Sequence, residues 1–246
     1  MQKLRKISNE ELKNILELHK KWLNNEEGGE RADLSYVDLA GVDLSYTDLS
    51  CANLIGTNLI DADLSYVNLK GAKLINANLT FTNLKGANLI STNLKGTDLR
   101  YVDLTGVDLS YANLSYTDLT SCDLTNANLS YVDLSYANLT GTNLTNCDLT
   151  NAKLRYADLT NAILIGAKLT NCDLYNTKLF YTKADNMISM GNLGNNNRTT
   201  YYFYKEDRVI CDCFDGTLEE FEEAVSKKYD KDSNYYIAIN TFKNLK

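Results

Sequence analysis

Leu recurs at every fifth position from Leu34 to Leu179, which makes thirty consecutive units. The residue two before each Leu is small, as Ala32 and Val37 illustrate, and the residue just before it is usually Asp or Asn. An unbroken short repeat dictates the architecture of a chain before any other pattern is considered. We therefore expect most of this protein to be a repetitive scaffold.

The five-residue period predicts short extended segments separated by bends. In a unit such as Ala62 to Tyr66, Ala62 and Leu64 flank the polar Asp63, which is the alternation of a strand. This alternation cannot continue across five residues, so the chain must bend once per unit, and a helical period of 3.6 does not fit either. These features indicate a β-solenoid whose coils stack about 4.8 Å apart.

The units resemble the motif Ala-(Asp/Asn)-Leu-x-x of the pentapeptide-repeat family over residues 32–181. The departures lie just before the Leu, at Lys73, Lys153, Ile163, Lys168 and Lys178. The segment Gly28 to Leu34 resembles the leader found on many bacterial and phage members. The resemblance implies an all-β solenoid, a right-handed quadrilateral β-helix with four units per coil. It would have about seven and a half coils and a length of roughly 36 Å.

Four units per coil would place residues twenty apart in one ladder and give the rod four sides. We name these the Leu34, Leu39, Leu44 and Leu49 sides after the first coil. The predicted core ladder of the Leu34 side is Leu34, Leu54, Leu74, Leu94, Leu114, Leu134, Leu154 and Leu174. The predicted partner-binding surface consists of outward aromatic and aliphatic residues, namely Tyr116, Tyr136, Tyr156, Ile55, Ile75, Ile60 and Ile90. The outward tyrosines could also simply stack on one another and stiffen the coil.

Two adjacent sides of the rod are predicted to be acidic. The Leu39 and Leu44 sides each carry five Asp against two Lys or Arg. Stacked pairs are expected on both: Asp98 with Asp118 on the Leu39 side, and Asp43 with Asp63 and Asp103 with Asp123 on the Leu44 side. The repeat also explains these residues as turn formers whose carboxylates bond the backbone.

We predict four segments: 1–31 as a capping α-helix and entry turn, 32–185 as the β-helix, 186–198 as a connector, and 199–246 as a small α+β module. Ser8 with Glu11 reads as a capping box for a helix over 8–24. Thr217 with Glu220 reads as a second one, for a helix reaching about Tyr229. The module should also contain strands over 199–204 and 208–214 and a helix over 233–245.

No catalytic, metal or cofactor site is predicted. Cys211 and Cys213 lack a second pair of ligands for zinc, and His19, the only histidine, lies on the apolar stripe of the first helix. Three other cysteines occupy small inward positions on different sides, so we expect core thiols without disulfides: Cys122, Cys147 and Cys172. Cys51 points outward as a free thiol.

These observations favour a non-catalytic scaffold that presents outward ladders to a protein partner of unknown identity or to a second copy in a homodimer. The first alternative, implied by the resemblance, is a DNA mimic that modulates a type II topoisomerase such as DNA gyrase. The second is an enzyme centred on the C-terminal module. The net charge of −7 disfavours direct nucleic-acid binding. With no long apolar run and no secretory signal-peptide pattern, we expect no membrane span and a cytoplasmic location.

Overall fold

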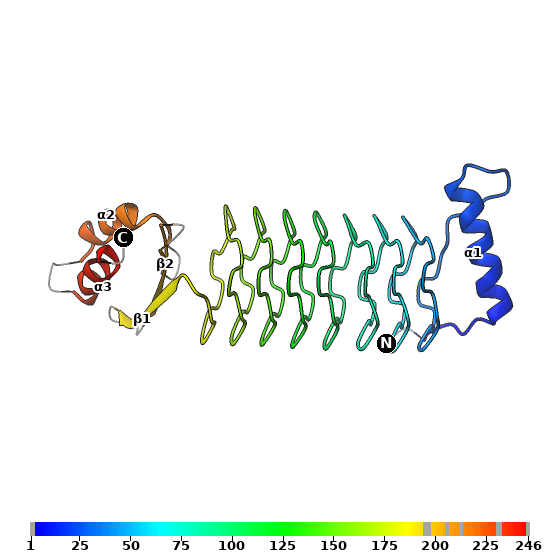
Figure 1. Ribbon diagram of the computed structural model, residues 1–246, viewed down its shortest axis with the longest axis horizontal. Coiled ribbons are helices and arrows are strands. Elements are labelled where there is room, and N and C mark those ends of the chain that lie inside the picture. The colour runs from blue at the N-terminus through cyan, green and yellow to red at the C-terminus, as the bar shows by residue number, and fades with distance from the viewer. Residues whose placement is uncertain (1–2, 194–197, 205–206, 212–213, 230–232, 245–246) are drawn as a thin grey trace.

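The protein is a rod of stacked coils with a helix across one end and a small α+β module at the other (Figure 1). The computed structural model describes residues 3–193, 198–204, 207–211, 214–229 and 233–244. Helix α1 spans Asn9–Leu23 and lies before the first coil. No helix in these described ranges is long and apolar enough to cross a membrane.

One coil takes twenty residues, or four units of the repeat. Parallel bridges join residues twenty apart, beginning with Asp33 and Asn53 and ending with Ile163 and Lys183. Each bridge is built from two backbone bonds, such as Leu34 N–H to the Asn53 carbonyl at 2.8 Å and Asn53 N–H to the Ala32 carbonyl at 2.9 Å. The predicted ladders of residues twenty apart are confirmed.

Each unit bends at the second residue after its Leu, which adopts a left-handed backbone. Tyr36, for example, has φ of 54°, and the turn closes through a bond of 3.3 Å from Val37 N–H to the Leu34 carbonyl. The Asp33 carboxylate accepts from Ser35 N–H at 3.0 Å within the same turn. Asp and Asn are therefore frequent before Leu because their side chains satisfy the turn backbone.

The core consists of inward Leu residues and the small residues beside them. All eight members of the predicted Leu34-side ladder are buried. Where the small residue is Thr, its hydroxyl donates to a Leu carbonyl in the preceding coil, as Thr117 does to Leu94 at 2.9 Å. The Cys122 thiol contacts the Leu99 carbonyl in the same way at 2.7 Å. Spacing indicated only that these cysteines fill a small inward position, and their bond to the preceding coil is visible only in the structure.

We expect the buried thiols to be unreactive in the folded protein. Burial raises the pKa of Cys122, Cys147 and Cys172 to about 12, whereas Cys51 is exposed. Because the thiolate is the nucleophile, a maleimide reagent should label Cys51 and spare these three until the protein unfolds. Peptide mass mapping after labelling measures this. Labelling of Cys147 as fast as Cys51 in the native state would contradict the prediction.

Helix α1 begins with half of the predicted capping box. The Ser8 hydroxyl accepts from Glu11 N–H at 3.0 Å, as expected. The Glu11 carboxylate accepts from the Arg5 guanidinium instead of turning back to Ser8. The difference arises because Arg5, which joins the edge of the first coil, offers a charged donor. Residue 29 must be Gly, because a Cβ there would lie 2.4 Å from the backbone nitrogen of Trp22 and would clash with the helix.

His19 packs α1 onto the rod. Its side chain is fully buried, its Nδ1 accepts from Ala32 N–H at 3.1 Å, and Trp22 stacks on its ring at 5.6 Å. Burial lowers the pKa of His19, with Asp48 opposing and Arg31 reinforcing that effect. The expected packing role agrees with this geometry.

The N-terminal cap should weaken as the solution becomes acidic. Because the folded pKa of His19 lies below its ordinary value of 6.5, the unfolded chain takes up the proton first. The contribution of neutral His19 is therefore complete above about pH 6.5 and falls as the pH drops through the folded pKa. Fluorescence of Trp22, the only tryptophan, should report loosening of α1 in this range. An unchanged signal down to about pH 5, or the same change in a His19→Gln control, would refute this.

The C-terminal module contains an antiparallel sheet in the order β1-β2-β3-β4. Its strands are β1 (Met187–Leu193), β2 (Arg198–Phe203), β3 (Arg208–Cys211) and β4 (Phe214–Gly216). The predicted connector over 186–198 is therefore wrong, since most of it is β1. Pairing of Ile188 with Tyr202 on β2 overrides the weak strand propensity of this Gly- and Asn-rich stretch. The predicted strand over 208–214 also divides into β3 and β4.

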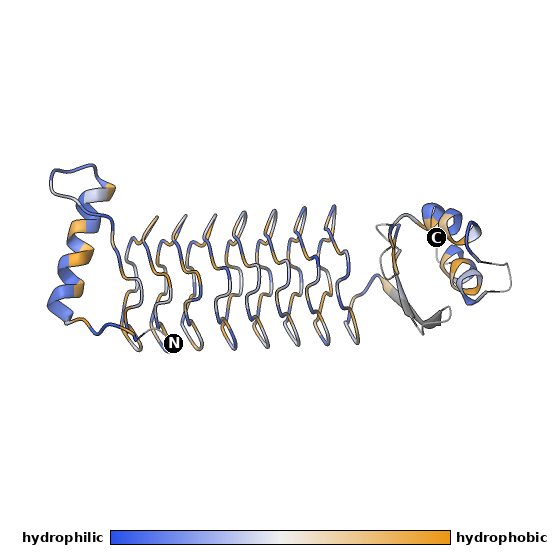
Figure 2. Cartoon of the chain, turned by 180° about the vertical axis from the view of Figure 1, so that it is seen from behind, coloured by the Kyte–Doolittle hydropathy of each residue, from blue (hydrophilic) through white to orange (hydrophobic). Residues whose placement is uncertain are grey.

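Alternation along the sheet separates two cores. Tyr201, Phe203 and Ile210 belong to the core of the rod, whereas Tyr202 and Val209 pack with the helices α2 (Leu218–Ser226) and α3 (Asn234–Lys243). The sheet thus closes the last coil with one face and carries the helices on the other (Figure 2).

The α2 capping box is confirmed, because Thr217 accepts from Glu220 N–H and Glu220 accepts from Thr217 N–H. Arg208 pairs with Asp215 and also donates to the Cys172 carbonyl of the rod. This guanidinium therefore ties the module to the repeat.

Candidate functional site: tyrosine corners and acidic sides

Tyr116, Tyr136 and Tyr156 form one continuous ladder at a corner of the rod. Their ring centroids are 4.8 Å apart at each step, with interplanar angles of 4° and 9°. The residues remain 56%, 48% and 41% exposed. Since the ring faces contact one another, a partner would meet ring edges and hydroxyl groups in a fixed row.

A second ladder borders the same side of the rod. Tyr111 and Tyr131 stack with centroids 4.8 Å apart at the corner preceding the Leu114 and Leu134 units. Other aromatic pairs stack at the two remaining corners: Tyr46 with Tyr66, and Phe81 with Tyr101. The predicted stacking of outward rings is thus confirmed for pairs along all four edges of the rod, while no ring stack involves Tyr36 or Tyr181 among the described residues. The Leu34 side is flanked by tyrosine ladders on both edges in the middle of the rod.

The four isoleucines do not join this tyrosine surface. Ile55, Ile75, Ile60 and Ile90 are all half-buried. Ile55 and Ile75 share the Leu34 side, but Ile60 lies on the Leu39 side and Ile90 on the Leu49 side, because each five-residue step turns the chain onto the next side. The single contact patch expected from the sequence is therefore not assembled, and the exposed aromatic ladders are its accessible part.

Ion pairs reduce the acidity of the Leu39 side. Arg100 Nη2 lies 2.7 Å from Asp98 Oδ2, and Arg100 Nε lies 3.9 Å from Asp118 Oδ2. The hydrogen bond from Arg100 lowers the pKa of Asp98. On the same side Lys178 Nζ lies 2.9 Å from Asp158 Oδ2. The carboxylates predicted to stack there are in register, but nearby cations pair with them and reduce the net negative charge of this side.

Four carboxylates of the Leu44 side are stacked in pairs. Parallel β-bridges pair Asp43 with Asp63 and Asp103 with Asp123, one coil apart. Within the part of the chain that the structure describes, none of the four takes part in a salt bridge. Hydrogen bonds from Thr105 lower the pKa of Asp103, which favours its charged form. This side therefore carries stacked carboxylates that form no salt bridge among the described residues.

The repeat also matches a known sequence profile. The profile of pentapeptide repeats matches eight copies between residues 30 and 179. The chain belongs to the pentapeptide-repeat family. Members fold as right-handed quadrilateral β-helices, and the twenty-residue coil with four sides agrees with that architecture.

Several solved pentapeptide-repeat proteins are similar to this chain. HetL, involved in heterocyst differentiation regulation in the cyanobacterium Nostoc sp. strain PCC 7120, is 37% identical over 62% of this chain and 73% of its own, with a TM-score of 0.26. A trypsin-treated form of QnrB1, a plasmid-mediated fluoroquinolone resistance protein, is 20% identical over 61% and 80%, with a TM-score of 0.42. Rfr23 from the cyanobacterium Cyanothece 51142 is 22% identical over 71% and 95%, with a TM-score of 0.19. No curated protein matches the chain.

This pentapeptide-repeat protein has no assembled metal site among its described residues, where no three His, Cys, Asp or Glu side chains converge. Cys211 is buried and accepts from the Thr200 hydroxyl at 3.0 Å, and Cys213 lies outside the described residues. The described surface offers ring edges, hydroxyl groups, carboxylates and the cationic groups of exposed Lys and Arg side chains.

Proposed function

We propose that this protein is a non-catalytic scaffold of about seven and a half coils that presents its outward ladders to a protein partner. The observation that carries the proposal is the ordered, exposed ladder of Tyr116, Tyr136 and Tyr156. Pentapeptide-repeat proteins are generally non-enzymatic scaffolds, which supports the same conclusion.

The ladder has the physical properties of a protein-binding surface. Tyrosine is enriched in interfaces because it combines a large apolar ring with a hydroxyl group. Stacking already fixes each ring, so binding would order few additional side chains. Lys95 lies over Tyr116, with its Nζ 5.4 Å from the ring centroid, and places a cation beside the first ring. A partner with apolar side chains and acceptor groups at a regular spacing would complement this row.

Capture of partners from the native host tests the proposal. The test variant replaces Tyr116, Tyr136 and Tyr156 by Asn, a residue that already occupies equivalent left-handed corners such as Asn126. The matched control replaces Tyr46 and Tyr66 by Asn at another corner. We expect the first variant to lose a protein that the native chain and the control both retain. Equal capture by all three, or no captured protein, would refute the role of this ladder.

A second candidate function is the modulation of a type II topoisomerase by DNA mimicry. The observation in its favour is the Leu44 side, where Asp103 and Asp123 stack in register and form no salt bridge among the described residues, although Lys85 acts electrostatically on Asp103. The ion pairs of Arg100 on the Leu39 side weaken it, because a mimic needs continuous negative charge. A DNA gyrase supercoiling assay decides: micromolar protein that neither inhibits nor protects the enzyme would exclude this function.

A further inference from the structure

The first coil leaves part of its backbone edge unpaired. In the second coil, Asp63 N–H donates to the Val42 carbonyl at 3.0 Å, and the Asp63 carbonyl accepts from Leu44 N–H at 2.8 Å. Asp43 occupies the same position one coil earlier, yet neither its N–H nor its carbonyl has a backbone partner among the described residues. The Leu44 side therefore begins with an open strand edge, which can pair with another extended chain.

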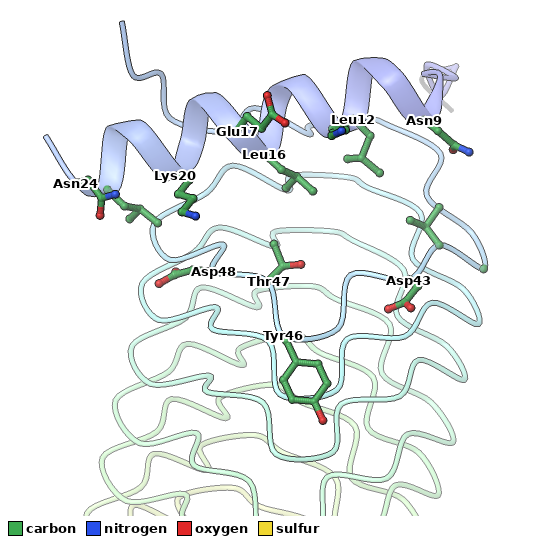
Figure 3. Close-up of a pocket in the computed structure, with 14 residues that line it drawn as sticks. Asn9, Leu12, Leu16, Glu17, Lys20, Asn24, Asp43, Tyr46, Thr47 and Asp48 are labelled. Carbon is green, nitrogen blue, oxygen red and sulfur yellow. The ribbon is translucent and has the colours of Figure 1, made fainter. Parts of the chain in front are cut away.

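Helix α1 crosses this end of the rod without filling it (Figure 3). A groove of about 1010 Å³ runs between α1 and residues 41–48 of the first coil, beside the contacts that dock the helix. Leu12 and Leu16 line it from the helix, and Val42, Asp43 and the segment 46–48 line it from the coil. Leu16 and Val42 are only half-buried. The groove thus combines apolar walls with the unpaired backbone of Asp43.

The neighbouring side shows how such an edge is extended. The N-terminal segment of this chain adds a parallel bridge between Arg5 and Val37 on the Leu39 side. Arg5 N–H donates to the Tyr36 carbonyl at 2.7 Å, and the Arg5 carbonyl accepts from Asp38 N–H at 2.9 Å. An extended segment from outside the repeat can therefore continue the ladder at this end of the rod.

Charge indicates the chemistry of the occupant. The first coil, residues 32–51, has four Asp and no Lys or Arg, and Asp43 and Asp48 line the groove from it, opposite Lys13, Glu17 and Lys20 of α1. Hydrogen bonds from Ser45 lower the pKa of Asp43, so its carboxylate stays charged. Elsewhere in the rod a cation in the preceding coil pairs with such a carboxylate: Arg155 Nη1 lies 3.5 Å from Asp173 Oδ2. A basic side chain stacked on Asp43 would find the same geometry.

We propose that the groove between α1 and the Leu44 side of the first coil binds an extended basic segment of a protein partner. The segment adds a parallel strand at Asp43 and places a Lys or Arg over its carboxylate. The residue before the basic one is small and the residue after it is Leu, and both side chains point inward as they do in each repeat unit. This site lies apart from the ladder of Tyr116, Tyr136 and Tyr156, so either proposal can fail without the other.

A peptide taken from the repeat itself provides the probe. The hexapeptide Thr-Asn-Ala-Lys-Leu-Arg copies residues 150–155 and carries Lys at the ladder position. Fluorescence anisotropy of the labelled peptide, titrated with the full chain, should show saturable binding. Asp43→Asn should weaken it about two- to fivefold, the usual effect of an exposed ion pair. Asp103→Asn, on the same side in mid-rod, should leave it unchanged.

A second peptide separates strand pairing from charge. N-methylation of its Leu removes the N–H that would donate to the Asp43 carbonyl, while the net charge stays the same. We expect this peptide to lose saturable binding. The Tyr116, Tyr136 and Tyr156 to Asn variant should bind the unmodified peptide as the native chain does, which keeps this test independent of the tyrosine ladder.

Four outcomes would overturn the proposal. The first is no saturable binding up to about 1 mM peptide. The second is equal weakening by Asp43→Asn and Asp103→Asn, and the third is undiminished binding of the N-methylated peptide. The fourth is that a second copy of this chain occupies the edge. Sedimentation would then show a dimer, and the peptide would dissociate it.

Discussion

Replacing Leu114 by Ala is expected to lower the free energy of unfolding by about 2–5 kcal/mol. Leu114 is fully buried, and its neighbours Leu94 and Leu134 in the ladder are fully buried as well. Backbone bonds to the coils on both sides, such as Leu114 N–H to the Asp133 carbonyl at 2.7 Å, prevent the coil from collapsing into the space. The cost should therefore include the cavity as well as the lost apolar contact.

Urea unfolding followed by circular dichroism measures this effect. Asn113→Asp is the matched control, because Asp and Asn both occur before Leu throughout the repeat and the substitution leaves the core intact. Each coil contacts only its neighbours, so hydrogen exchange should rise first in the coils around Leu114. A loss below about 1 kcal/mol, or an equal loss in the control, would contradict close packing of this ladder.

Replacing Leu12 by Asp is expected to release helix α1 from the rod. Leu12 is 8% exposed and packs against the core of the first coil. An unpaired carboxylate at this position costs about 3 kcal/mol or more while the helix stays docked, so detachment becomes favourable. The end of the first coil then loses its cover, and exposed strand edges promote end-to-end association.

Sedimentation and the fluorescence of Trp22 measure the two consequences. We expect a higher average mass than that of the native chain and a shift of Trp22 emission towards that of an exposed indole. Lys13→Asp is the matched control, since Lys13 is the next residue of the helix and is exposed. If the Leu12 variant keeps the native mass and emission, α1 does not cap the rod in the way its contacts indicate.

The repeat and the helix starts could be predicted because they depend on residues close in sequence. Each unit contains its own small residue, Leu and turn former, and Ser8 and Thr217 cap the residues that follow them. Strand β1 could not be predicted, since only pairing with β2 makes it a strand. The predicted hydrogen bond from Ser8 N–H to the Glu11 carboxylate does not form, because Arg5, which is not part of the capping motif, donates to that carboxylate instead.

The candidate site was predictable in its positions and not in its accessibility. The tyrosine ladder of Tyr116 to Tyr156 follows from the spacing of twenty residues, and the structure places these rings in stacks. The half-burial of the isoleucines depends on contacts with neighbouring coils, which spacing does not give. Neutralisation of Asp98 by Arg100 depends on the side-chain geometry that brings them together.

The five-residue period by itself determined the solenoid, its inward Leu ladders and the corners that carry outward residues, because all of these repeat within single units. Only the tertiary structure decided which charges are paired, which side chains stay exposed and where an edge of the first coil remains open. These properties depend on contacts between residues one coil apart and on where α1 and the C-terminal sheet cover the ends of the rod. Sequence spacing does not contain those contacts.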